Sequence, residues 1–106
     1  MMDIIEAAGD IRDFLGDTEE ESFLLNRHLQ SAVLFKLIVI GYAAGRISQK
    51  IKDKHDAMPW DEMMSFTDYL QNPKGILAEK VWVSAVVDVP DIQSAARDIL
   101  ISEYGK

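Results

Sequence analysis

The residues that most often carry chemistry in enzymes are scarce in this chain. It contains no cysteine and only two histidines, His28 and His55, which excludes thiol catalysis, disulfide bonds and cysteine-ligated zinc. Neither histidine has an Asp or Glu at the i+4 position, where a helical metal site would place a second ligand. We therefore expect both histidines to be solvated or capping residues, and we expect no metal site and no cofactor.

Three basic residues, Arg46, Lys50 and Lys54, recur at four-residue intervals. On one helix this spacing places them on one face, where they are candidates for contacts with an anion or with RNA phosphates. The same pattern is typical of cations near a helix C-terminus, where the helix dipole favours positive charge and the side chains stay in water. The sequence leaves both interpretations open.

An apolar cluster follows at i, i+3 and i+4 spacing, formed by Phe66, Tyr69 and Leu70. Such a cluster is ordinary core if the helix turns it inward. Exposed, it would mark an interface, because contiguous aromatic side chains on a surface usually take part in association. We treat the three residues as interface candidates.

These residues must be positioned by helices, because apolar residues recur with the helical period along almost the whole chain. The longest such pattern runs from Arg27 to Lys52 after a possible N-cap at Asn26, and it is apolar on several sides, as in a helix with several neighbours. We expect it at the centre of a bundle. Its least accessible residues should be Val33, Leu37, Ile38, Gly41 and Ala44.

A further helix should begin at Pro59 and end near Leu70, because Pro73 disfavours helical geometry just beyond. The valine-rich segment 76–87 suits a strand as well as a helix, but its apolar spacing favours a helix. Pro90 should open the last helix. The sequence therefore predicts an all-α bundle of about five helical segments, with residues 1–106 forming a single domain.

The net charge of −7 is unevenly distributed: residues 1–25 carry −7, residues 26–54 carry +5 and residues 55–106 carry −5. This balance disfavours RNA as a partner, because phosphate neutralisation supplies most non-specific affinity. The most apolar stretch, Ala32–Ala44, is 13 residues long, whereas a membrane span needs about 20. The acidic first residues also lack the positive flank of a signal peptide. We expect a cytoplasmic protein without a membrane partner.

A series of short segments, mostly at packing and turn positions, carries a resemblance to a known family. They are Asp3-Ile4, Ile11, Glu20–Phe23, Ala32-Val33, Ile40–Ala44, Pro59-Trp60, Val81-Trp82 and Asp88–Pro90. Their order is similar to that of the HepT-like proteins of the HEPN superfamily, which are small all-α ribonuclease toxins encoded beside a minimal nucleotidyltransferase antitoxin. The resemblance covers nearly the whole chain, and it implies a homodimer paired about its cleft.

The ribonuclease motif of that family is an Arg, a His five residues later and a Tyr two residues after the His. Gap-free counting places Phe66 at the Arg position, Gln71 at the His position and Pro73 at the Tyr position, and Tyr42 stands where the family has a Glu. Phe66 has no charge to hold a phosphate, and Gln71 cannot titrate near neutral pH. Pro73 offers no hydroxyl for the adenylylation through which the family's antitoxin acts. We expect no catalytic residue at these positions.

Two functions follow from the resemblance. The first is a catalytically silent HepT-like component of a toxin–antitoxin type module, which acts by dimerisation or by binding a partner such as a minimal nucleotidyltransferase. The second is an active HepT-like ribonuclease toxin that uses a non-standard residue set and is neutralised by a nucleotidyltransferase antitoxin.

Overall fold

The computed structural model describes residues 1–71 and 78–105, and every regular element in these two ranges is helical. The elements are α1 (Met2–Leu15), α2 (Glu20–Leu24), α3 (Arg27–Gly45), α4 (Gln49–Lys54), α5 (Trp60–Ser65), η1 (Phe66–Leu70), α6 (Ala78–Val83), η3 (Ser84–Asp88) and α7 (Val89–Tyr104). Of these, η1 is a 3₁₀-helix and η3 is a π-helix. The predicted all-α fold class is confirmed.

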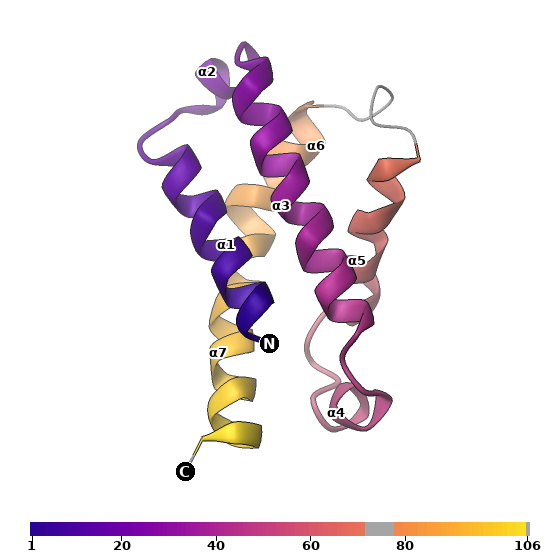
Figure 1. Ribbon diagram of the computed structural model, residues 1–106. Coiled ribbons are helices and arrows are strands. Elements are labelled where there is room, and N and C mark those ends of the chain that lie inside the picture. Colours follow the sequence, from indigo (N-terminus) through magenta and orange to yellow (C-terminus); the bar gives the residue numbers. More distant parts are fainter. Residues whose placement is uncertain (72–77, 106) are drawn as a thin grey trace.

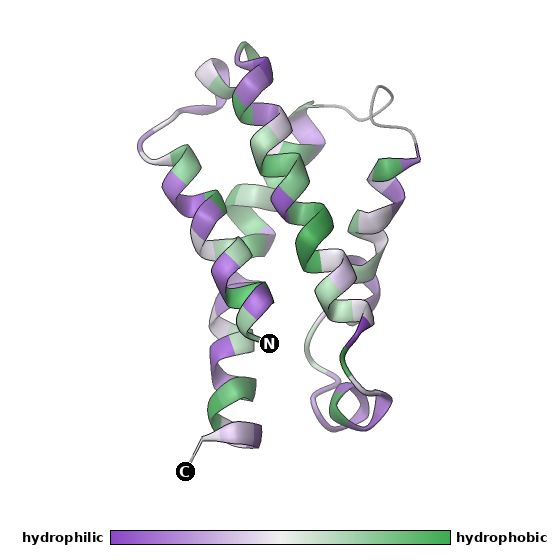
Figure 2. Cartoon of the chain, viewed as in Figure 1, coloured by the Kyte–Doolittle hydropathy of each residue, from purple (hydrophilic) through white to green (hydrophobic). Residues whose placement is uncertain are grey.

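Helix α3 is the central element of the bundle. It packs against α1 on one side and against α5 and η1 on the other, while α7 packs against α1 (Figure 1). The most hydrophobic colours of Figure 2 lie in the middle of α3. Val33, Leu37 and Ala44 have no exposed surface, Ile38 is 8% exposed and Gly41 is buried. The prediction of the least accessible residues is therefore confirmed.

Among the described residues, α3 is the one helix that is long and apolar enough to cross a membrane by length and composition. In the structure this apolar character serves the core, because the buried side of α3 joins the cluster formed by α1, α5 and α7. The opposite side is open: Phe35 is 60% exposed and Tyr42 is 51% exposed. The arrangement is consistent with a soluble protein.

The central helix is shorter than predicted. It ends at Gly45 rather than at Lys52, and α4 starts as a separate helix. The physical reason is a capping residue: the Ser48 Oγ accepts a hydrogen bond from the Ile51 N–H at 3.3 Å, which satisfies one of the unpaired donors at the start of α4. The predicted cap at the other end is confirmed, because the Asn26 Oδ1 accepts from the Leu29 N–H at 3.0 Å.

The described part of the valine-rich segment is helical, and it runs without interruption through α6, η3 and α7. Pro90 lies in the first turn of α7, as predicted, although no break separates α7 from η3. A proline inside an α-helix lacks the donor for the carbonyl four residues back and clashes with it. The π-turn relieves this conflict just before Pro90, where the Val89 N–H bonds to the Ser84 carbonyl five residues back.

Helices α3 and α5 approach closely at Gly41. A Cβ atom built there would lie 2.8 Å from the Thr67 Cγ2 and 2.9 Å from the Met63 carbonyl oxygen. Only a glycine leaves room for this contact, which brings η1 onto the core. Both η1 and α5 are thereby held against the centre of the bundle.

Candidate functional site

Phe66, the residue that gap-free counting assigns to the family's Arg position, is a core residue. Its side chain is 2% exposed, and its ring stacks on Tyr69 with 6.0 Å between ring centroids. The interface interpretation of Phe66 is therefore wrong: the first turn of η1 points this side chain inward, against α3. Tyr69 is half-buried and Leu70 is 52% exposed, so these two residues retain surface for association.

Gln71, the residue that gap-free counting assigns to the family's His position, is exposed at the end of η1. Its backbone N–H closes the 3₁₀-helix by donating to the Asp68 carbonyl at 3.1 Å. Pro73, which the same count assigns to the Tyr position, lies outside the described residues. Phe66 and Gln71 therefore lie in different environments: the Phe66 side chain is inside the core, and the Gln71 side chain is exposed to solvent.

A pocket of about 280 Å³ opens beside Phe66, between α5 and η1 on one wall and α6 and η3 on the other. Its lining consists of Glu62, Ser65, Phe66, Asp68, Tyr69, Lys80 and Ser84. The Lys80 Nζ lies 5.8 Å from the centroid of the Tyr69 ring, a cation–π contact. We call this hollow the η1 pocket.

Glu62 lines the η1 pocket and has a carboxyl neighbour outside that lining, Asp88. Glu62 from α5 and Asp88 from η3 are joined by a side-chain hydrogen bond. Burial raises the pKa of Glu62 above its ordinary value, and the nearby charge of Asp88 and the bond between the two groups raise this pKa further. Two neighbouring carboxyl groups that share a hydrogen bond favour one shared proton over two negative charges.

Sequence reasoning missed Glu62, Lys80, Ser84 and Asp88. The sequence does indicate that three of them share a helix face, because Lys80, Ser84 and Asp88 follow one another at four-residue intervals, the same spacing as in the basic row that begins at Arg46. Glu62 lies 26 positions before Asp88 in the sequence, so only the tertiary structure brings the two carboxyl groups together. The strand alternative for segment 76–87 also obscured the helical spacing.

Tyr42 does not belong to the η1 pocket. It lines a separate hollow with Gly41, Gly45, Arg46, Met64 and Thr67, and the two linings have no residue in common. The proposed cleft neighbour is therefore on another surface, because η1 turns its Thr67 side toward α3 and its Asp68–Tyr69 side toward α6.

The predicted basic row is not a continuous face, because α3 ends before it is complete. Arg46 follows α3 and its Nη2 lies 3.2 Å from the Asp3 Oδ2, whereas Lys54 ends α4 and its Nζ lies 3.0 Å from the Glu103 Oε2. Lys50 is exposed on α4. Two of the three candidate anion contacts are thus engaged by carboxylates of the same chain.

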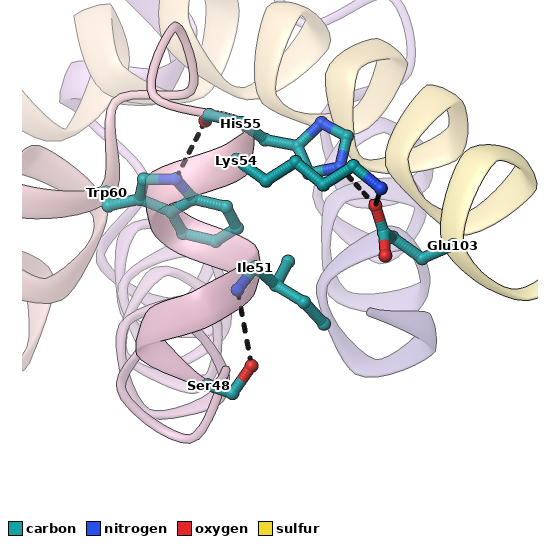
Figure 3. Close-up of polar contacts among 6 residues, drawn as sticks. All are labelled: Ser48, Ile51, Lys54, His55, Trp60 and Glu103. Atoms are coloured by element: carbon teal, nitrogen blue, oxygen red, sulfur yellow. Dashed lines mark hydrogen bonds and ion pairs between the residues drawn. The ribbon is translucent and has the colours of Figure 1, made fainter.

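His55 joins the end of α4 to the last turn of α7 (Figure 3). Its Nε2 lies 2.7 Å from the Glu103 Oε2, and its backbone carbonyl accepts a hydrogen bond from the Trp60 Nε1–H at 3.0 Å. The bonds from His55 and then from Lys54 lower the pKa of Glu103 below its ordinary value. His55 is the C-cap residue of α4, in agreement with the expected capping role. Its partner Glu103 lies 48 positions away, and no pattern in the sequence indicates this contact.

Within the described ranges, no group of three or more His, Cys, Asp or Glu side chains is arranged to hold a metal ion. His28 is exposed at the start of α3. The η1 pocket combines a cation over a phenol ring with the carboxyl group of Glu62.

The fold is an all-α bundle around a long central helix, with a pocket beside the end of α5. Residues 4–99 match the model of the ribonuclease HepT-like family. The chain belongs to the HepT-like family.

Curated relatives agree with this assignment. The chain is 31% identical to a Methanocaldococcus jannaschii protein named "Putative RNase MJ1216", over 100% of this chain and 88% of the relative. It is 32% identical to the "Probable ribonuclease HepT" of Thermococcus cleftensis, over 86% of this chain and 84% of the relative. No solved structure gives a significant match.

Proposed function

We propose that this chain is a catalytically silent HepT-like component of a toxin–antitoxin type module in the cytoplasm. It acts through association, as a homodimer or with a partner such as a minimal nucleotidyltransferase. Membership of the HepT-like family supports the module, and the replacement of the family's motif supports the loss of catalysis.

The observation that carries the proposal is the burial of Phe66. An Arg at this position would have to hold a phosphate, but Phe66 is 2% exposed and packs inside the core. Gln71 cannot transfer a proton near neutral pH. The loss of a general acid or base costs about 10²–10⁴ in rate, and the loss of a charge that stabilises the transition state costs about another 10²–10³.

The proposal is tested by incubating the purified protein with total RNA and with tRNA, in the presence of EDTA. The Thermococcus cleftensis protein named "Probable ribonuclease HepT" serves as the positive control. We expect no cleavage above a buffer blank under conditions in which the control digests its substrate. Cleavage that persists through purification and disappears in a single-residue variant would contradict the proposal.

One observation favours the second candidate function, an active ribonuclease with a non-standard residue set. The η1 pocket lies beside the family's motif position and contains a cation, Lys80, as well as the hydroxyl of Tyr69. In this case the unmodified chain cleaves RNA and Lys80→Ala abolishes the activity, whereas Lys50→Ala on the exposed side of α4 leaves it unchanged. The same assay therefore separates the two functions.

A further inference from the structure

A groove of about 310 Å³ lies between the C-terminal half of α1 and the continuous helical run of α6, η3 and α7, which passes behind α1 in Figure 1. Its polar lining residues are Arg12, Thr18 and Gln93, and the other lining residues are apolar. It shares no lining residue with the η1 pocket. We call it the α1–α6 groove.

Both walls of the groove present side chains with helical spacing. On the α6–α7 wall the lining residues Trp82, Val86, Val89 and Gln93 follow one another at i, i+4, i+7 and i+11. This wall is about 16 Å long at about 1.5 Å per residue, or three turns of helix. The α1 wall has matching i, i+4 and i+7 spacing in Ala8, Arg12 and Leu15. A groove of this form accepts a helix whose apolar residues recur every three or four positions.

The apolar surface of the groove is held in place by the core. Trp82 is half-buried, and its ring lies 5.2 Å from the ring of the fully buried Phe23, measured between centroids. Tryptophan held in this way gives a partner a large contact area at little cost in conformational entropy. Val86 lies in the π-turn and is 37% exposed, and π-turns are frequent at functional sites. Covering Val86 would remove apolar surface from water.

The rim of the groove is acidic. Asp13, Asp17 and Asp91 are exposed, and each directly follows a lining residue in the chain. Arg12 is the basic residue of the lining, but its Nε lies 4.0 Å from the Asp13 Oδ1, and residues 82–93 contain no Lys or Arg. The electrostatic potential at the mouth of the groove therefore favours a positively charged partner.

We propose that the α1–α6 groove binds an amphipathic, positively charged helix of a partner protein. The apolar side chains of this helix pack against Trp82 and Val86. Lys or Arg residues on its flanks face Asp13, Asp17 and Asp91. The apolar contacts supply most of the affinity, and the charges select the partner and speed the encounter.

This inference rests on the proposed mode of action, association with a partner, and it identifies the surface and the chemistry of that partner. It does not rest on the loss of catalysis. RNA cleavage by the protein would overturn the proposed function and leave the groove proposal standing. Failure of the groove to bind a helix would overturn this inference alone.

The test uses the full chain and a fluorescein-labelled peptide of about 14 residues, long enough to form a helix on binding. The peptide consists of Leu at i, i+3, i+4 and i+7 spacing and Lys elsewhere, and a matched peptide carries Glu in place of Lys. Fluorescence anisotropy should show saturable binding of one Lys peptide per chain at sub-millimolar concentration and much weaker binding of the Glu peptide. Raising the ionic strength from about 0.05 M to about 0.5 M should weaken binding at least about threefold.

Variants in the lining locate the bound peptide. Trp82→Ala should weaken binding at least about tenfold, and Val86→Ser should weaken it about three- to tenfold. The matched control is Val87→Ser, because Val87 is 55% exposed on the same π-turn but does not line the groove. It should bind the peptide like the unmodified chain. Circular dichroism checks that each variant is folded, and Val86→Ser decides the test if Trp82→Ala does not fold.

A second pair of variants tests the acidic rim. Asp17→Asn should weaken binding of the Lys peptide about two- to threefold. Asp61→Asn changes the net charge equally on α5, which does not line the groove, and should leave binding unchanged. The proposal is overturned if the Lys peptide does not saturate, if both peptides bind equally, or if Val86→Ser has no more effect than Val87→Ser. It is also overturned if Val86→Ser converts a dimer into a monomer in light scattering without peptide, because a second copy of the chain then occupies the groove.

Discussion

At the scale of single residues, the burial of Phe66 bears both on the stability of the fold and on whether the protein can be active. Its ring is enclosed between α3 and Tyr69, so Phe66→Ala should leave a cavity and destabilise the fold by about 3–5 kcal/mol. Phe66→Arg should cost at least as much, because it buries a charge without a partner. Urea unfolding followed by circular dichroism measures both losses.

The control for Phe66 is Leu70→Ala on the exposed end of η1, which should change stability by no more than about 0.5 kcal/mol. A folded Phe66→Arg protein with unchanged stability would contradict the core assignment. If the prediction holds, the family's motif cannot be restored by substitution alone, because the position has been absorbed into the core.

Glu103 provides a prediction about pH. Its pKa is lowered in the folded state by the bonds from His55 and Lys54, so its contribution to stability is present above the ordinary Glu pKa of about 4.3 and is lost as the pH falls through the lowered value. Glu103→Gln should therefore lower the urea midpoint at pH 7, and the difference should shrink in acid. An equal difference at both pH values would contradict the ion-pair assignment.

Asp88 should show the opposite sign. The raised pKa of Glu62 means that the folded state binds more protons than the unfolded chain, so stability falls as the pH rises through the interval between the two pKa values. Asp88→Asn removes one cause of the shift and should stabilise the protein at neutral pH by less than about 1 kcal/mol, the range of exposed charge pairs. The gain should vanish in acid, where both carboxyl groups are protonated.

At the scale of elements, two glycines one turn apart on α3 make a matched pair. Gly41→Ala places a Cβ 2.8 Å from the Thr67 Cγ2 and should destabilise the protein by about 1–3 kcal/mol through overpacking. Gly45→Ala meets nothing within 4 Å and should be neutral or stabilising by up to about 1 kcal/mol. Thermal unfolding of both variants measures how tightly α3 and η1 are packed.

The sequence predicted the elements better than their ends. The apolar stripe of α3 identified its buried residues because periodicity reports directly which face packs. The end at Gly45 was missed because the Ser48 cap is a local hydrogen bond inside a stretch whose apolar period continues beyond it. The π-turn before Pro90 was missed for a related reason: a helix can absorb a proline by changing its hydrogen-bond register.

The candidate site was less accessible to sequence reasoning than the fold. The motif positions could be counted, but whether Phe66 would be core or surface depends on which side of η1 faces α3. The Glu62–Asp88 and His55–Glu103 contacts join segments far apart in the chain. Such pairs depend on tertiary packing, and a single sequence carries no period that reports them.

At the scale of the whole molecule, we expect a homodimer, because an open apolar side of α3 is a poor surface for a monomer. Light scattering at micromolar concentration should give twice the chain mass of 11.9 kDa. Tyr42→Asp on α3 and Leu70→Asp on η1 test the two exposed apolar surfaces, and the one at the interface should weaken dimerisation about thirtyfold or more.

The control for dimerisation is Leu25→Asp, because Leu25 is 86% exposed at the end of α2 and makes little contact with the core. It should leave the oligomeric state unchanged. A monomer at micromolar concentration would contradict the prediction. A dimer that resists both test variants would assign the interface to a different surface.

The pairing of α1 with α7 has a consequence for how the chain folds as it is synthesised. The Gln93 Nε2 donates to the Ile5 carbonyl at 3.2 Å, across 88 positions of sequence. During translation at about 5–20 residues per second, the part of α1 that α7 covers therefore stays uncovered for roughly 4–18 s, until α7 is made. In that interval the nascent helices α1 and α3 expose apolar surface, so we expect the emerging chain to bind ribosome-associated chaperones.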